Sequence, residues 1–167
     1  MGLAVAIPVI VLAAFLTGAI WGPPVGPTQP IAYSHRIHAG QYQIQCQYCH
    51  YTAEQSSWID VPPVEVCMGC HRITAADRPE VQKLQKYWNE KRPIPWVRVH
   101  FLPEHAKFNH KRHVKAGFAC QTCHGPVEQM DVVYQYSSLS MNWCINCHNG
   151  NNELNKKASV DCLTCHY

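Results

Sequence analysis

Three things are missing from this 167-residue sequence, and each absence narrows what the chain can be. The 14 lysine and arginine residues are scattered rather than clustered, which argues against a nucleic-acid-binding surface. No charged residue occurs in the first 21 positions, MGLAVAIPVIVLAAFLTGAIW. No cysteine lies outside one repeated motif, so no thiol is left for any other purpose.

The repeated motif is Cys-x-x-Cys-His, and it uses all ten cysteines of the chain. Two thiols one helical turn apart can each form a thioether with a haem vinyl group, and the next residue then presents an imidazole to the iron. The five motifs are Cys46, Cys49 and His50; Cys67, Cys70 and His71; Cys120, Cys123 and His124; Cys144, Cys147 and His148; and Cys162, Cys165 and His166. The sequence therefore predicts five covalently attached haem c groups.

Zinc and disulfides explain the cysteines less well. Zinc ribbons also use Cys-x-x-Cys pairs, but a zinc ion takes four ligands and gives no reason for a histidine after every pair. Disulfides impose neither the fixed inner spacing nor the trailing histidine.

The density of haem limits the fold. After an anchor at residues 1–21, about 29 residues remain for each haem, too few for separate globular pockets. We expect a mostly irregular chain with short helices around one shared five-haem core, and no stable fold without the cofactor. The propionates of five haems would also reverse the sign of the formal charge of +3.

The uncharged segment 1–21 predicts a single transmembrane anchor. A helix of this length spans roughly 30 Å, the thickness of the hydrocarbon core of a bilayer. A cleaved signal peptide is the alternative, but the basic region that precedes its apolar core is missing here. Residues 22–32 then form a stiff linker rich in Pro and Gly. Because haem c is attached outside the cytoplasm, we expect the domain at 33–167 on the periplasmic or extracytoplasmic side of the cell membrane.

An internal repeat divides the haem domain. YSHRIHAGQYQIQCQYCH matches FNHKRHVKAGFACQTCH in order: an aromatic residue, two histidines three positions apart, then the haem motif. A second motif follows in each half. The chain therefore reads as two related two-haem units, 33–71 and 108–148, with a fifth haem at 162–166.

The paired histidines of the repeat are candidates for the second, distal iron ligands. A pure electron carrier normally fills both axial positions of its haem iron. Histidines at i and i+3 of a helix project about 60° apart, so they can serve two different haems. We predict that His35 and His38 bind two irons and that His110 and His113 bind two more.

The sequence offers three candidates for the fifth distal ligand, Met141, His100 and His105. Met141 comes first because it lies three residues before Cys144, and a thioether ligand would raise the potential of that haem. His100 lies in the strand-like stretch WVRVHF, opposite to Val97 and Val99. For His105 an exposed role is favoured.

The segment between the two units carries no haem motif. Thr74 and Asp77 resemble a helix cap before PEVQKLQKYWNE, in which Val81, Leu84 and Trp88 share one helical face.

Two families resemble this sequence. The paired patterns YSHRIH…CQYCH and FNHKRH…CQTCH are similar to class III multihaem cytochromes, whose small haem-cored fold and bis-histidine ligation are what the resemblance implies. The N-terminal anchor, the five motifs, WVRVHFLPEHAKFNHKRH and MNWC together resemble the pentahaem subunit of alternative complex III.

The second resemblance implies a respiratory function. It implies a membrane-anchored electron carrier, without a catalytic site of its own, that works beside an iron-sulfur subunit and integral membrane quinol-binding subunits. Its electrons would pass to a cytochrome, a blue-copper protein or a terminal oxidase. Two alternatives stay open: a reductase with one open haem iron, and a related quinone reductase that runs electrons towards quinone.

Overall fold

The computed structural model describes residue 13, residues 25–59 and residues 61–167. Apart from Ala13, the predicted anchor lies outside the described residues, and so does the first part of the linker. Within the part of the chain that is described, we find no helix of the length and apolar character needed to span a membrane.

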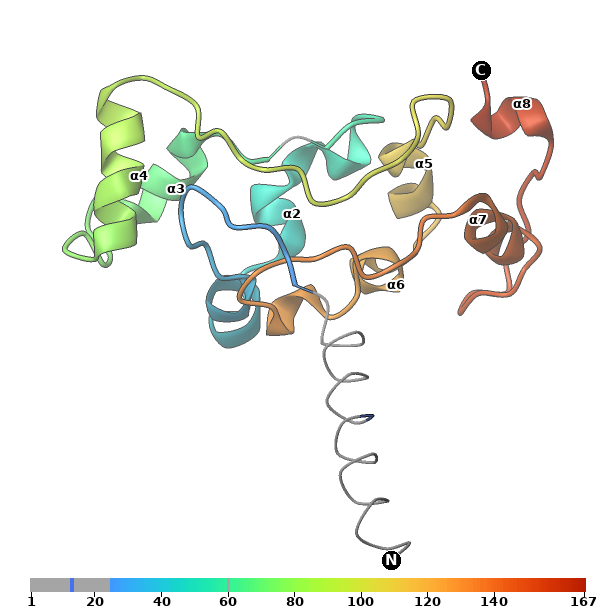
Figure 1. The fold of residues 1–167 in the computed structure, drawn as a ribbon, viewed down its shortest axis with the longest axis horizontal. Helices are drawn as coiled ribbons and strands as arrows, with labels where there is room; N and C mark the ends of the chain where they lie inside the picture. Colours follow the sequence, from blue (N-terminus) through green and yellow to red (C-terminus); the bar gives the residue numbers. More distant parts are fainter. Residues whose placement is uncertain (1–12, 14–24, 60) are drawn as a thin grey trace, which may run out of the picture.

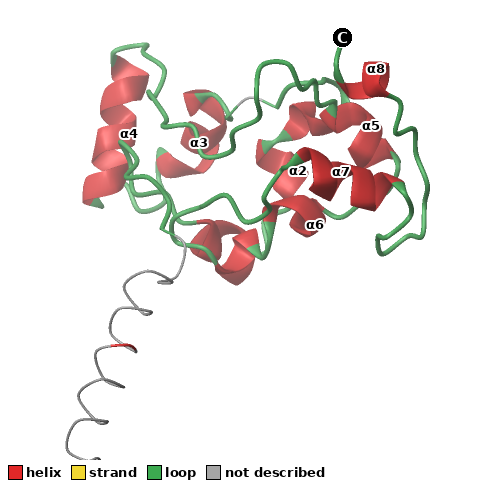
Figure 2. Cartoon of the chain, turned by 45° about the vertical axis from the view of Figure 1, so that its right-hand side comes forward, coloured by secondary structure: helices red, strands yellow, loops and turns green. Residues whose placement is uncertain are grey.

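Short helices joined by long irregular segments make up the described chain, and no strand occurs in it (Figures 1 and 2). The prediction of a mostly irregular fold with short helices is confirmed. In chain order the elements are η1 (Arg36–Gln41), α2 (Cys46–Cys49), η2 (Tyr51–Glu54), α3 (Val64–His71), α4 (Pro79–Asn89), α5 (His110–Lys115), α6 (Cys120–His124), η3 (Val127–Gln129), α7 (Met141–His148) and α8 (Cys162–Cys165). Element η1 is a π-helix, and η2 and η3 are 3-10 helices.

The haem-free helix α4 forms close to the predicted place. Val81 and Leu84 are buried on its inner face, as the helical period predicts. The predicted cap is wrong: Arg78 stands at the N-cap without a side-chain hydrogen bond, and Pro79 opens the helix. Proline suits the first helical position because its missing N–H would have no partner there.

A small side-chain core lies between α3 and α4, at one end of the molecule (Figure 1). It contains Ile31, Val64, Met68, Leu84 and Ile94. No other cluster of this kind occurs among the described residues, and none of their large side chains is fully buried. Most of the molecule must therefore obtain its apolar interior from something other than aliphatic side chains.

The linker is docked against the domain rather than held away from it. The Gln29 side chain exchanges two hydrogen bonds of 2.9 Å with the backbone of Val97. The sequence around Val97 is strand-like, but residues 92–109 form no helix or strand. The backbone N–H and C=O of Val97 bond to the Gln29 amide instead of to a neighbouring strand. Ala32 N donates to Glu80 Oε2 of α4 at 2.7 Å.

The two halves of the chain pack against each other reciprocally. Helix η1 of the first half lies against η3, which follows the first haem motif of the second half. Helix α5 of the second half lies against η2, which follows the first haem motif of the first half. Backbone hydrogen bonds secure both contacts, from Arg36 N to Met130 O at 3.0 Å and from Lys111 N to Ser56 O at 3.1 Å. The first helix of each copy of the sequence repeat thus packs against the other copy.

Gly125 ends α6 in a conformation that only glycine adopts easily, with φ at 70° and ψ at −168°. A Cβ atom at this position would lie 2.4 Å from Cγ of Tyr136. The ring of Tyr136 therefore packs directly on the backbone that leaves the third haem motif.

Replacing Gly125 with alanine should destabilise the holoprotein by about 1–3 kcal/mol through backbone strain, before the clash with Tyr136 is counted. Thermal unfolding followed by circular dichroism would measure the loss. Gly69→Ala is the matched control, because a Cβ at Gly69 in α3 meets nothing within 4 Å. Equal unfolding midpoints for the two variants would contradict this account of Gly125.

Candidate haem-binding sites

Each Cys-x-x-Cys pair occupies one turn of helix. Helices α2, α6 and α8 contain almost no residues outside the motif, whereas α3 and α7 have an additional turn before it. Side-chain caps fix the start of two of these helices: Ser140 Oγ accepts from Trp143 N in α7 at 3.3 Å, and Asp161 Oδ1 accepts from Leu163 N in α8 at 2.9 Å. Side chains at i and i+3 of a helix share one face, so each pair presents two sulfurs side by side. None of the ten cysteines is in a disulfide.

Histidines distant in sequence face the motif histidines in pairs. An imidazole nitrogen binds a first-row metal at about 2 Å, so two imidazoles on opposite sides of one iron have ring centroids roughly 6 Å apart. Four pairs have this spacing: His38 with His71 at 6.0 Å, His113 with His148 at 6.0 Å, His105 with His166 at 5.6 Å, and His110 with His124 at 6.4 Å. The residues present therefore fit bis-histidine haem irons.

His35 lies near the remaining motif histidine, His50. Burial, and next the neighbouring His50, lower the pKa of His35 to about 4. In the repeat His35 corresponds to His110, which faces the equivalent motif histidine, His124. The first histidine of each pair thus lies near the motif histidine that follows it more closely in sequence, and the second lies near the more distant one.

An aromatic ring holds both histidines in each half. Tyr33 stacks on His38 with centroids 4.4 Å apart and meets His35 edge-on at 4.8 Å. In the second half, Phe108 stacks on His113 with centroids 4.3 Å apart and meets His110 edge-on at 4.7 Å. The aromatic residue of the sequence repeat therefore orients the two ligands.

Backbone carbonyls accept a hydrogen bond from Nδ1 of most candidate ligands. Such a bond keeps the proton on Nδ1 and leaves the lone pair of Nε2 for a metal. The bonds run from His38 to Ser34 O at 2.9 Å, His113 to Asn109 O at 2.8 Å, His110 to Ser57 O at 3.2 Å, His71 to Thr74 O at 2.9 Å, His148 to Ser159 O at 2.7 Å, and His166 to His105 O at 2.8 Å.

Burial keeps several of these imidazoles uncharged. It is the largest cause that lowers the pKa of His110 and His113, and it lowers the pKa of His124 to about 4. A histidine must be neutral to bind a metal, so these side chains are ready to act as ligands.

The three candidates for the fifth distal ligand lie in different places. Met141 begins α7 with 63% of its surface exposed, and no described contact joins it to a motif histidine. His100 approaches His124 from the Nδ1 side, with Nε2 of His100 3.2 Å from Nδ1 of His124. His105, favoured as an exposed residue, is exposed but lies beside His166.

Two further hydrogen bonds hold the last motif against the loop of His105. Lys107 N donates to Cys165 O at 2.8 Å, and His166 donates to the carbonyl of His105. The sequence favoured an exposed role for His105, which lies between Glu104 and Ala106. The position of His105 beside His166 is a contact that no sequence pattern indicates.

The thiols place the five motifs in one row. A neighbouring thiolate raises the pKa of a thiol, so it identifies an adjacent motif. Burial, and next Cys70, raise the pKa of Cys49, and burial, and next Cys46, raise the pKa of Cys120. Burial and then Cys147 raise the pKa of Cys123 to about 11, and burial and then Cys165 raise the pKa of Cys144. Motifs with neighbouring thiols are adjacent, so the order in space is second, first, third, fourth, fifth. The ribbon shows the same sequence, from α3 through α2, α6 and α7 to α8 (Figure 1).

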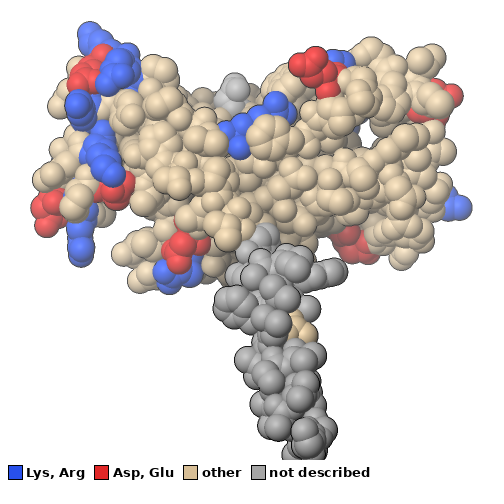
Figure 3. All heavy atoms as spheres, in the orientation of Figure 1, with Lys and Arg blue, Asp and Glu red and all other residues tan. Residues whose placement is uncertain are grey.

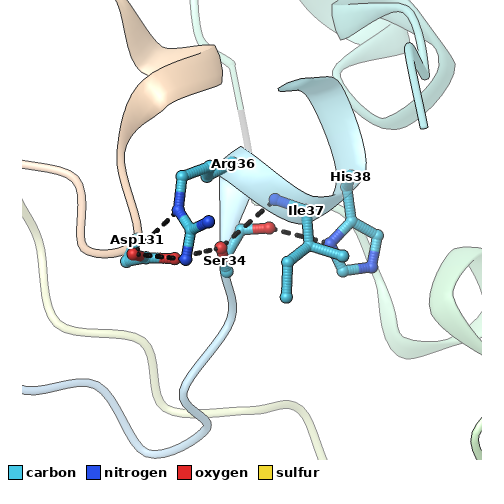
Figure 4. Close-up of polar contacts among 5 residues, drawn as sticks. All are labelled: Ser34, Arg36, Ile37, His38 and Asp131. Atoms are coloured by element: carbon cyan, nitrogen blue, oxygen red, sulfur yellow. Dashed lines mark hydrogen bonds and ion pairs between the residues drawn. The ribbon is translucent and has the colours of Figure 1, made fainter. Parts of the chain in front are cut away.

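Asp131 ties the ligand-bearing helix η1 to the second half of the chain (Figure 4). Its carboxylate accepts from Ser34 Oγ at 2.6 Å and from Arg36 Nε at 2.9 Å. Ser34 in turn supplies the carbonyl that holds Nδ1 of His38. This exposed network therefore helps to position the His38 side chain.

Comparison with known proteins supports multihaem cytochromes as the relevant class. Residues 106–167 match the family model described as cytochrome c7 and related cytochrome c, and covalently bound haem c is characteristic of that family. Over 160 residues the chain is 25% identical to the protein named menaquinone reductase, multiheme cytochrome c subunit, of Nitratidesulfovibrio vulgaris. The alignment covers 83% of this chain and 76% of that protein.

Replacing Asp131 with asparagine should lower the thermal midpoint of the holoprotein at neutral pH. Hydrogen bonds from Ser34 and then Arg36 lower the pKa of Asp131, so its ionised form stabilises the fold above its unfolded pKa, and this stability is lost as the pH falls through the folded value. The midpoints of the wild type and Asp131→Asn should therefore converge below about pH 4.

Asp77→Asn is the control for this experiment, because it removes the same charge from an exposed aspartate whose carboxylate makes no described hydrogen bond. A midpoint difference for Asp131→Asn that persists unchanged in acid would show that the ionised carboxylate is not the stabilising group.

Proposed function

We propose that this chain is a membrane-anchored pentahaem cytochrome c that carries electrons within a quinone oxidoreductase complex similar to alternative complex III. The observation that carries the proposal is the set of histidine pairs. Four of the five motif histidines have a partner ring at the spacing of bis-histidine iron, and His35 lies near the fifth, His50. Haem c supplies iron that alternates between the ferrous and ferric states, and the chain supplies two sulfurs, two imidazoles and an apolar site for each group.

The row of motifs gives the chain two ends at which electrons can enter or leave. One end lies at Cys67 and Cys70, beside the side-chain core and α4. The other lies at Cys162 and Cys165, in the exposed C-terminal segment. We infer that an iron-sulfur or quinone-reactive partner contacts one end and that an acceptor protein contacts the other.

The docked linker supports the proposed anchoring. Because Gln29 and Ala32 bond to the domain, an anchor at residues 1–21 would hold the haem row close to the membrane surface on the extracytoplasmic side. Partner subunits in the membrane would then reach it directly.

All five haem irons of the membrane-extracted protein should be low-spin in the oxidised state and should not bind carbon monoxide when reduced, because both axial positions are filled. Electron paramagnetic resonance and optical spectra measure both properties. His105→Ala should convert one haem in five to the high-spin form, whereas Met141→Leu should convert none.

The opposite result for these two variants would make Met141 the fifth ligand. A high-spin haem that binds carbon monoxide in the wild type would favour a reductase with an open iron instead.

The direction of electron flow has two candidates. The resemblance to alternative complex III favours flow from menaquinol to a periplasmic acceptor, whereas the name of the relative favours flow towards menaquinone. The purified complex should oxidise a menaquinol analogue with a soluble cytochrome or copper protein as the acceptor. If it instead reduces the menaquinone analogue only when supplied with a reduced cytochrome, the second direction holds.

A further inference from the structure

His124 is held differently from the other motif histidines whose Nδ1 bonds are described. His71, His148 and His166 each donate from Nδ1 to a backbone carbonyl. At Nδ1 of His124 lies Nε2 of His100, 3.2 Å away, with the two rings perpendicular at 86° and their centroids 4.6 Å apart. A side-chain imidazole therefore takes the place of the carbonyl at this site.

His100 does not have the geometry of an axial ligand partner for His124. Two imidazoles on one iron point their Nε2 atoms at each other, whereas His100 approaches the opposite edge of the His124 ring. The facing position belongs to His110, whose ring is nearly parallel to that of His124, at 7°. Nδ1 of His110 is engaged by Ser57 O, so its Nε2 is available for the iron.

The backbone on both sides of His100 is fixed. Gln29 binds Val97, the Arg98 guanidinium donates from Nε to the His100 carbonyl at 2.8 Å, and Phe101 N donates to Gln135 Oε1 at 3.0 Å. The half-buried ring is thus held beside His124 by contacts on either side of it. This arrangement suits a positioning residue.

We propose that His100 accepts a hydrogen bond from Nδ1 of His124 and thereby lowers the reduction potential of the haem at Cys120 and Cys123. The inference rests on the proposed bis-histidine haems. An imidazole lone pair is a stronger acceptor than an amide carbonyl, so it makes His124 a more basic ligand, and a more basic ligand favours ferric over ferrous iron.

The affected site is the middle one of the row, between the motifs of Cys46 and Cys144. Every electron that crosses from one two-haem unit to the other passes this position. His100 would therefore set the energy of the step that joins the two halves.

The test is a spectroelectrochemical titration of the purified holoprotein carrying His100→Leu. One of the five one-electron transitions should move to a more positive potential, and a tenfold loss of preference for ferric iron corresponds to about 59 mV. His100→Gln, which keeps a carbonyl acceptor, should move it less. Val97→Ala, at an exposed position of the same stretch, should leave all five transitions in place.

A second pair of variants identifies the haem concerned. His110→Gly should make the haem at Cys120 and Cys123 high-spin, which marks it in the optical and paramagnetic spectra. Adding His100→Leu to this background should shift the potential of the marked haem.

The failures of the two proposals are distinct. Five low-spin haems with unchanged potentials in His100→Leu would overturn the role of His100 while leaving the pentahaem assignment intact. A new high-spin haem in His100→Leu would make His100 an axial ligand, which also overturns it. A wild-type protein without five low-spin haems would instead contradict the proposed function.

Discussion

The proposed haem sites place one requirement on this protein, that each iron takes two imidazoles from opposite sides. The histidine pairs join separate segments of the chain, such as those of His105 and His166, whose ring centroids lie 5.6 Å apart. The side-chain core is confined to the region of α3 and α4. Because few aliphatic side chains are buried elsewhere among the described residues, we expect folding and cofactor attachment to be coupled.

The reciprocal packing of the two halves explains the order of the motifs. Helix η1 rests on η3 and α5 rests on η2, so the first motifs of the two units meet at the centre and the second motifs lie outside them. The row is therefore symmetric over four sites. The fifth site extends one end, and it needs only a loop that offers the His105 ring, the His105 carbonyl and the Lys107 amide.

Much of the candidate site could be predicted from the sequence, because the chemistry of haem attachment fixes residue types at fixed spacing. The ten cysteines, their five histidines and the paired histidines of the repeat all follow from local patterns. The proximity of His105 to His166 could not be predicted, since the two residues lie far apart along the chain and no periodicity links them. The cap of α4 was mispredicted because Pro79 at the first turn outweighs the polar residues Thr74 and Asp77 before it.

The means by which the chain can tune its irons are limited by where its charges lie. Charged side chains gather over α4, and few lie over the middle of the face shown in Figure 3. Near the central motifs Glu153 acts on Cys123 and Cys147, and the other variables are burial and the group that holds Nδ1 of each histidine. Backbone carbonyls vary little in strength and do not titrate, so they give the ligands similar basicity. A side chain at that position is a simple way to make one site differ from its neighbours, and among the motif histidines whose Nδ1 contacts are described, His124 has one.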